Sequence, residues 1–217
     1  VGVMVDVGAH YGAALDNFAA DGWQVIAFEP DKNNREKLSR VYGAYPNVTI
    51  DSRGISDHMD DNVPFYTSAE SSGISGLLSF DQSHQSAGTI SVTTLEQVLI
   101  EYEVREIDFL KIDTEGLDLS VLSGLPDSTT PKVIVCEFED RKTLTLGYVY
   151  SDLADELVRR GYFVIMSEWH PLEKYGQRHK WRRAVEWPAK VLDKNAWGNF
   201  VAVSDKKLAK QILRAFP

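Results

Sequence analysis

Two glycines and a histidine follow the first apolar segment of the chain, in the run Asp6-Val-Gly8-Ala-His10-Tyr-Gly12. Glycines allow a tight turn and a close approach of the backbone to a ligand, and a helix that begins after them presents unpaired N–H groups. The spacing predicts a strand-to-helix turn that binds a small molecule. A merely tight turn is the alternative.

An acidic residue, Glu29, ends the next apolar segment, about 20 residues after the first turn. A carboxylate at this place can accept hydrogen bonds from both ribose hydroxyls of a nucleoside. The dinucleotide fingerprint G-x-G-x-x-G needs a glycine where this chain has His10, because that glycine makes room for a pyrophosphate. The two motifs indicate a nucleoside cofactor without phosphates, such as S-adenosylmethionine, and leave an NAD-dependent oxidoreductase as the alternative.

Carboxylates gather after two later apolar segments: Asp113 and Glu115 follow one, and Glu137 and Glu139 end the other. If the strands are parallel, these ends meet at one edge of the sheet, where open α/β sheets bind ligands. The carboxylates could act as a base or hold a divalent metal ion such as Mg²⁺. The metal ligands would be Asp113, Glu137 and Glu139. The reading we favour has no metal, with one carboxylate as base and the others paired with Lys111, Arg141 or Lys142.

Apolar runs too short for helices alternate with longer amphipathic stretches, a pattern typical of an α/β sheet. Strands are expected at residues 2–7, 24–28, 48–51, 107–112, 132–138, 162–167 and 199–204. Helices are expected at residues 11–21, 31–43, 94–103, 117–123 and 150–160. The sequence predicts one domain over residues 1–217, with a Rossmann-like, seven-stranded, mostly parallel sheet, an antiparallel last strand and helices on both faces.

Two long connections interrupt this pattern, at about residues 57–93 and 170–197. Connections of such length usually do more than join two elements, so we expect both to contribute to an acceptor site. In the first, residues 64–67 and 90–93 are expected to form an antiparallel pair. The second is rich in Arg, Lys and Trp, including Arg182 and Arg183, which suits a sugar or an anionic acceptor. A solvated helical lid or a docking surface is the alternative.

His84 and His170 lie within these two connections and are further candidates for a general base. A lone histidine is more often structural or solvated, and this alternative stands for both.

The composition limits which binding partners and which cellular compartment are expected for this protein. A net charge of −9 argues against a general nucleic-acid binder, which needs a surplus of Lys and Arg. The single Cys136 lies in an apolar run, so we expect a buried thiol, no disulfide and a reducing, cytoplasmic location. Neither a signal peptide nor a membrane span is expected in this chain. Because it starts at Val1, it is expected to belong to a larger polypeptide.

A set of short segments follows in a definite order: Asp6 to Gly12, Phe28 to Asp31, Gly54 to Asp57, Thr94-Leu95, Asp108 to Gly116, Val121 to Gly124 and Cys136-Glu137. Together they resemble the motifs of FkbM-family methyltransferases, over roughly residues 3 to 140. That family usually has Asn where this chain has His10. This difference affects only the one contact that residue 10 is expected to make with the cofactor.

The resemblance implies S-adenosylmethionine-dependent O-methylation of a hydroxyl on a sugar, glycan or glycosylated natural product, as in polysaccharide biosynthesis. By motif position, the cofactor-binding residues would be Asp6, Gly8, Ala9, His10 and Gly12 for the amino-acid end, Glu29 for the ribose, Gly54 and Ile55 for the adenine, and Asp113 near the methyl group. The catalytic candidates are Asp113, Glu115, Glu137 and His170. A cofactor-binding or docking module without catalytic activity is a further alternative.

Overall fold

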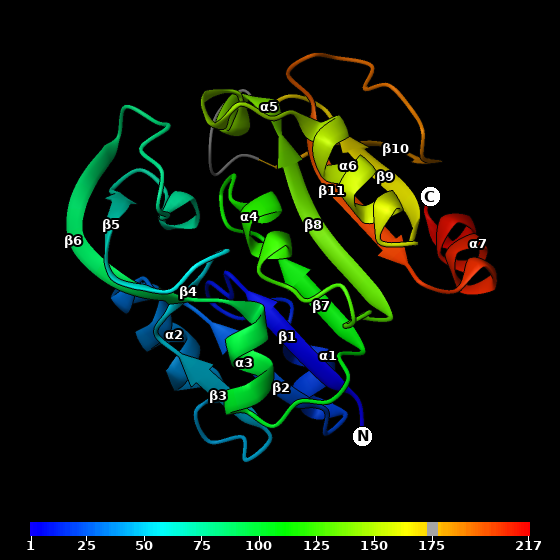
Figure 1. Ribbon diagram of the computed structural model, residues 1–217. Helices are drawn as coiled ribbons and strands as arrows, with labels where there is room; N and C mark the ends of the chain where they lie inside the picture. The colour runs from blue at the N-terminus through cyan, green and yellow to red at the C-terminus, as the bar shows by residue number, and fades with distance from the viewer. Residues whose placement is uncertain (173–177) are drawn as a thin grey trace.

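The chain folds around one large sheet with helices on both faces (Figure 1). The computed structural model describes residues 1–172 and 178–217. The sheet has eight strands in the order β10-β9-β11-β8-β7-β1-β2-β3. The strands are β1 Val3–Val7, β2 Gln24–Phe28, β3 Val48–Asp51, β7 Phe109–Ile112, β8 Val133–Glu139, β9 Phe163–Trp169, β10 Trp181–Glu186 and β11 Trp197–Val203.

The predicted α/β class and mostly parallel sheet are confirmed, but the predicted number of strands is wrong. The strands β3, β2, β1, β7 and β8 are parallel neighbours, and β11 runs antiparallel to β8 and β9, as expected for the last strand. An eighth strand, β10, pairs with β9 at the edge. Its side chains are at most half-buried, so it offers no continuous apolar run to recognise.

The helices are α1 Asp16–Ala20, α2 Lys32–Tyr42, α3 Leu95–Glu101, α4 Asp118–Ser123, α5 Asp140–Thr143, α6 Tyr150–Arg159 and α7 Lys206–Ala215. Polar side chains cap several of them: Asp31 accepts hydrogen bonds from two N–H groups at the start of α2, and Thr94 accepts one at the start of α3. Helix α1 is shorter than predicted, because the turn before it contains residues with positive φ. Within the described residues, no helix combines the length and apolar character needed to cross a bilayer.

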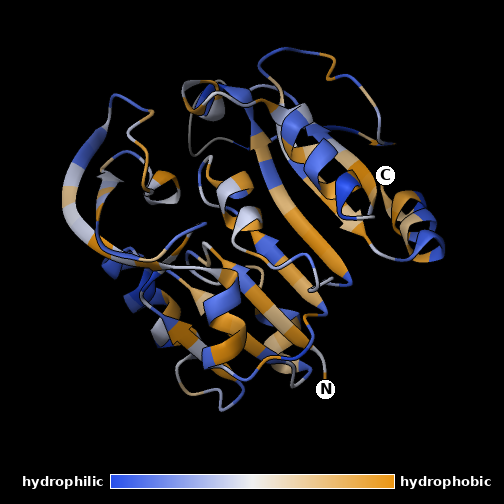
Figure 2. Cartoon of the chain, viewed as in Figure 1, coloured by the Kyte–Doolittle hydropathy of each residue, from blue (hydrophilic) through white to orange (hydrophobic). Residues whose placement is uncertain are grey.

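Two apolar clusters hold the helices to the sheet. One joins α3, α4 and α6 to one face, and the other joins α1 and α2 to the opposite face. Strand side chains that face these clusters, such as Leu110, Ile134 and Phe200, are fully buried, and Cys136 is buried as predicted. Figure 2 shows the matching pattern, with apolar residues concentrated along the central strands.

The predicted insertion forms a small second sheet, with strands in the order β4-β6-β5. Strand β5 (Asp60–Ser68) and strand β6 (His84–Thr93) form an antiparallel hairpin, and β4 is Gly54–Ile55. The predicted antiparallel arrangement is confirmed, but its register is wrong, because Pro64 pairs with Thr89 and Val63 pairs with Ile90. The hairpin extends beyond the main sheet, and its connection holds the short 3-10 helix η1, Ser72–Ile74 (Figure 1).

Candidate functional site

The turn after β1 depends on glycine at two positions. Gly8 has a φ of +79°, and a Cβ there would lie 2.0 Å from the carbonyl oxygen of Asp113. Gly12 has a φ of +84°, and a Cβ there would lie 2.4 Å from the Tyr42 ring and 2.6 Å from Leu38. Glycine at these positions therefore lets the turn pack closely against the end of β7 on one side and against α2 on the other.

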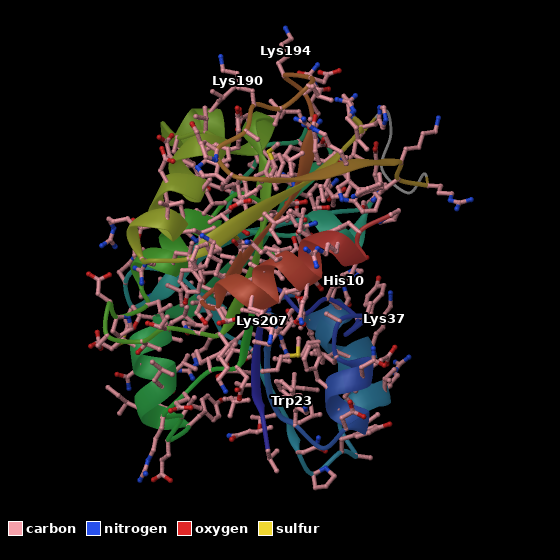
Figure 3. All side chains as sticks on the ribbon, turned by 90° about the vertical axis from the view of Figure 1, so that its right-hand side faces the viewer. His10, Trp23, Lys37, Lys190, Lys194 and Lys207 are labelled. Atoms are coloured by element: carbon pink, nitrogen blue, oxygen red, sulfur yellow. The ribbon has the colours of Figure 1, made fainter. Side chains whose placement is uncertain are left out.

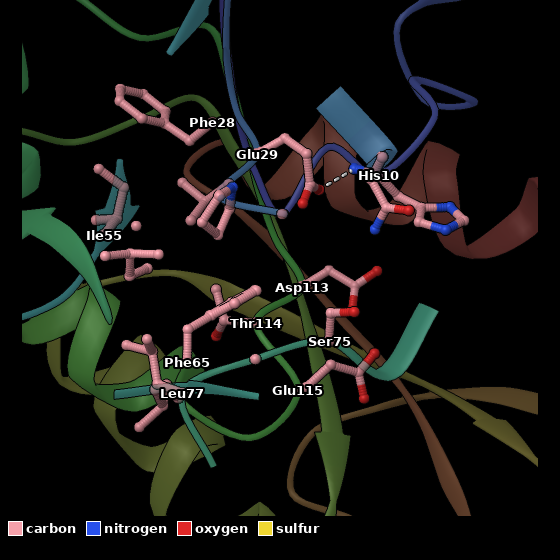
Figure 4. A pocket seen from close by; sticks show the side chains of 18 of the residues that line it. His10, Phe28, Glu29, Ile55, Phe65, Ser75, Leu77, Asp113, Thr114 and Glu115 are labelled. Atoms are coloured by element: carbon pink, nitrogen blue, oxygen red, sulfur yellow. Dashed lines mark hydrogen bonds between the residues drawn. The ribbon is translucent and has the colours of Figure 1, made fainter. Parts of the chain in front are cut away.

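Glu29 joins this turn to the end of β2. Its side chain is buried, with 5% of its surface exposed. Its two carboxylate oxygens accept hydrogen bonds from the backbone N–H groups of His10 (2.7 Å) and Asp31 (2.9 Å), the former drawn in Figure 4. Burial raises the pKa of Glu29 to about 7. Because each ionised oxygen has a further lone pair, the carboxylate can still accept hydrogen bonds from a ligand.

Asp6 lies beneath the turn. It is fully buried, and the Lys111 ammonium donates to its Oδ1 at 3.0 Å and to the carbonyl of Gly8 at 2.9 Å. The same ammonium lies 3.6 Å from Oδ2 of Asp113. Burial raises the pKa of Asp6. The Asp6–Lys111 pair thus holds β1, the turn and the end of β7 together.

A cavity lies at the carboxyl ends of β1, β2 and β7 and against the β5–β6 hairpin. Most of the predicted cofactor-binding residues line it: Gly8, His10, Glu29, Gly54, Ile55 and Asp113. Ala9 and Gly12, like Asp6, support the turn without lining the cavity. In Figure 4, the apolar side chains lie on one side of the cavity, and the carboxylates of Glu29, Asp113 and Glu115 lie on the other; the apolar residues are Phe28, Ile55, Phe65 and Leu77.

The hairpin connection contributes wall residues of this cavity that sequence reasoning did not identify individually. Ser72 Oγ lies 3.1 Å from Nε2 of His10 and 2.5 Å from the hydroxyl of Tyr11. Lys37, beside His10 in Figure 3, donates to that Tyr11 hydroxyl at 2.8 Å. Ser75 donates to Asp31 at 2.9 Å. The predicted acceptor element 57–93 therefore contacts the first turn directly.

Three carboxylates meet at the rim of the cavity. One oxygen each from Asp113, Glu115 and Glu137 lie within 4.8 Å of one another, a spacing that could hold a metal ion. Glu139, the third ligand of the predicted metal set, is not in this group, and Glu115 takes its place. The Lys142 ammonium already lies 2.7 Å from Glu115 and 2.6 Å from Glu137. Burial raises the pKa of both Glu115 and Glu137.

Asp118, at the start of α4, was not predicted as a site residue. It is buried and accepts hydrogen bonds from the N–H and hydroxyl of Thr114 (3.3 and 2.8 Å) and from the N–H of Glu137 (2.9 Å). It therefore joins the turn after β7 to β8. The signal available in the sequence was a third acidic residue after Asp113 and Glu115, in a run that otherwise reads as the start of a helix.

The two candidate histidines do not line the cavity. Both ring nitrogens of His84 have partners within the hairpin connection, the carbonyl of Ile74 at 2.8 Å and the N–H of Asp81 at 3.3 Å. His170 follows β9, and β11 lies between β9 and β8 in the sheet. The Nδ1 atom of His170 lies 2.9 Å from the Arg182 guanidinium. The folded chain thus groups Asp113, Glu115 and Glu137 without His170.

Two basic residues of segment 170–197 pair with a buried carboxylate. Arg182 and Arg183 lie 3.0 and 2.7 Å from the two oxygens of Glu168, which is 0% exposed. Figure 3 shows Lys190 and Lys194 far from His10. Residues 173–177 of this predicted acceptor segment lie outside the described residues.

The mostly parallel sheet and the glycine turn after its first strand together define a domain of the Rossmann-like α/β class. Residues 6–164 match the family described as Methyltransferase FkbM domain. The chain therefore belongs to the FkbM methyltransferase domain family, which confirms the resemblance found in its motifs. S-adenosylmethionine-dependent methyl transfer is the activity of this family.

One relative is AMB antimetabolite synthetase AmbE of Pseudomonas aeruginosa, 27% identical over 205 residues. The match covers 76% of this chain and 10% of the relative, so the chain spans about a tenth of that protein's length.

Solved structures of methyltransferases are also similar. Precorrin-6y C5,15-methyltransferase from Geobacter metallireducens has a TM-score of 0.48 at 12% identity, covering 93% of this chain and 79% of that one. Magnesium protoporphyrin IX methyltransferase from Synechocystis, solved with bound SAH, has a TM-score of 0.47 at 11% identity, covering 93% and 73%.

Proposed function

We propose that this chain binds S-adenosylmethionine in the cavity beside Glu29 and transfers its methyl group to a hydroxyl oxygen. The observation that carries the proposal is that the wall holding Glu29 continues through Asp113 to the carboxylate of Glu115 (Figure 4), and Glu137 lies within reach of the last two. Such a wall suits a ribose at one end and a hydroxyl nucleophile at the other. The apolar side, with Phe28 and Leu77, suits an adenine ring.

The chemical step needs little beyond positioning and a proton acceptor. The acceptor oxygen attacks the methyl carbon, a C–O bond forms, the C–S bond breaks, and the electron pair stays on sulfur. The hydroxyl proton passes to a carboxylate of the rim, Asp113, Glu115 or Glu137. Burial raises the pKa of Glu115 to about 7, which suits a base near neutral pH, because proton acceptors act best with a pKa near the working pH.

We further propose that the acceptor is a sugar, a glycan or a glycosylated natural product. Clustered carboxylates suit a polyhydroxylated molecule, because each oxygen can accept a hydrogen bond from a hydroxyl. The same negative charge disfavours an anionic acceptor, and Arg182 and Arg183 are already paired with Glu168.

Residues 1–217 would form one methyltransferase domain, and this domain would work within a larger polypeptide. The relative AmbE supports this organisation, because the chain corresponds to about a tenth of its length.

The first test is calorimetric titration of the protein with S-adenosylhomocysteine and, separately, with NAD⁺. We expect binding of S-adenosylhomocysteine alone. Glu29→Ala should weaken it by at least about 100-fold, because two hydrogen bonds to a charged group contribute about 1.5–3 kcal/mol each. Radiolabelled methyl transfer to a panel of glycans and non-glycosylated alcohols then tests the acceptor.

Binding of NAD⁺ in place of S-adenosylhomocysteine would overturn the cofactor proposal. Binding of S-adenosylhomocysteine without transfer to any hydroxyl acceptor would favour a docking module over an O-methyltransferase.

A further inference from the structure

A buried lysine lies at the centre of the carboxylate cluster. Lys142, in the short helix α5, is 2% exposed. Its ammonium lies 2.7 Å from Glu115, 2.6 Å from Glu137 and 3.1 Å from Glu139. Glu115 follows β7, whereas the other two carboxylates belong to β8. One cation therefore links the ends of two neighbouring strands.

The surrounding chain encloses this lysine. A Cβ at Gly116, which has a φ of +104°, would lie 3.0 Å from Cβ of Lys142, so a larger residue would press on the lysine. The Phe80 ring of the hairpin connection lies 5.7 Å from the ammonium. An unpaired buried ammonium is costly, but three carboxylates compensate this one. Burial lowers the pKa of Lys142, and the three carboxylates outweigh this and raise it.

The positive charge of Lys142 is neutralised by the carboxylates around it. The ammonium contacts one oxygen of Glu115 and one of Glu137, in each case Oε2, so the second oxygen of each carboxylate is left for another partner. Lys142 itself is absent from the cavity wall, as is Glu137, whereas Glu115 lines it. A role for Lys142 in methyl transfer must therefore act through the glutamates.

We propose that Lys142 is a positioning residue for methyl transfer: it draws Glu115 and Glu137 together from two strand ends and leaves one oxygen of Glu115, which lines the cavity, for the acceptor hydroxyl. This inference rests on the function proposed above. In this arrangement a lysine supplies the positive charge that a divalent cation would otherwise supply to the three carboxylates.

The test compares Lys142→Met with the parent protein in steady-state methyl transfer, with Lys132→Met as the matched control. Lys132 is 62% exposed and pairs with Asp108, away from the cavity. For Lys142→Met we expect kcat to fall about 100-fold, within the range that a positioned proton acceptor contributes. The affinity for S-adenosylhomocysteine should change less than threefold. Lys142→Arg, which keeps the charge, should recover part of kcat, and Lys132→Met should leave both kcat and the affinity for S-adenosylhomocysteine unchanged.

A second readout does not depend on activity. Without the lysine, the carboxylates of Asp113, Glu115 and Glu137 should bind one Mn²⁺, because one oxygen of each lies within 4.8 Å of the others and carboxylate oxygens suit this ion. Electron paramagnetic resonance titration should detect this Mn²⁺ in Lys142→Ala but not in the parent protein, and a further Glu115→Gln change should abolish it.

The positioning role is overturned if Lys142→Met keeps kcat within threefold of the parent, or if kcat and cofactor affinity fall together. It is also overturned if Lys142→Ala binds no Mn²⁺. If the parent protein methylates no hydroxyl acceptor, the proposed function fails before any variant is made. The Mn²⁺ titration then decides separately whether Lys142 organises the carboxylates.

Discussion

Glu29 must keep two backbone N–H groups in place and, in the proposed function, also accept hydrogen bonds from a ribose. Only the ionised carboxylate has enough free lone pairs for all of these bonds. Burial raises its pKa to about 7, so a proton competes with the ligand in the neutral range. We expect affinity for S-adenosylhomocysteine to be highest above pH 7 and to fall by up to about tenfold per pH unit below it.

Calorimetric titration at several pH values between about 5.5 and 8 measures this dependence. In Glu29→Gln, which cannot titrate at this position, the affinity should be weaker and the slope much flatter. A parent affinity that stays constant over this range would contradict the prediction.

The site residues that could be predicted from the sequence are those that carry a local signal. Gly8 and Glu29 stand at the ends of apolar runs with a recognisable spacing, and the structure brings both to the cavity. Lys142 was expected only as a possible partner of a carboxylate, and Asp118 was not expected in the site. Their roles come from contacts between separate strands and helices, which periodicity does not encode.

At the scale of elements, the β5–β6 hairpin positions the residues that cover the cavity. Its last register pair is Ser68 with His84, and the hydroxyls of Ser68 and Ser83 lie 2.6 Å apart, so the strands already meet where the connection begins. An Asn-Gly turn should therefore be able to replace residues 69–83 without separating the strands. This replacement removes Ser72, Ser75 and Leu77 from the cavity wall.

We expect the shortened protein to fold with nearly unchanged circular dichroism and to bind S-adenosylhomocysteine at least tenfold more weakly, because it loses apolar and polar wall contacts. A Ser86→Ala variant in the same hairpin serves as control, since Ser86 is exposed and does not line the cavity. Unchanged affinity in the shortened protein would show that the connection does not contribute to cofactor binding.

The strands of this hairpin could be predicted because they contain residues of high β propensity, such as Val63 and Ile90. The contacts of the Ser- and Gly-rich connection could not, because polar and glycine residues have no periodicity to follow.

At the scale of the whole molecule, the strand that completes the centre of the sheet comes late in the chain. β11 lies between β8 and β9, and Phe200, Ala202 and Val203 in it are 0% exposed. Burial of side chains of this kind contributes about 1.5–3 kcal/mol for each large one. A protein ending after Trp169 would therefore leave β8 and β9 without the strand between them, although it contains the whole family match.

We expect the 1–169 protein to lack a cooperative unfolding transition in urea. The 1–205 protein, which keeps every strand and loses only α7, should unfold cooperatively at a lower urea concentration than the parent. Cooperative unfolding of the shorter protein would contradict a central role for β11. Sequence patterns identified β11 from its apolar run, but its place inside the sheet depends on long-range pairing that such patterns do not specify.

The central place of β11 also sets the order in which the chain can mature on the ribosome. After β8 has emerged, its free edge stays open until Val203 has been made. At about 5–20 residues per second, that interval is roughly 3–13 s. During it, Ile134, Cys136 and Phe138 lie on a strand with one unpaired edge, which is the kind of surface that chaperones recognise and neighbouring nascent chains can pair with. The yield of folded protein in cells should therefore depend on chaperone supply and on translation speed, and not only on the stability of the finished sheet.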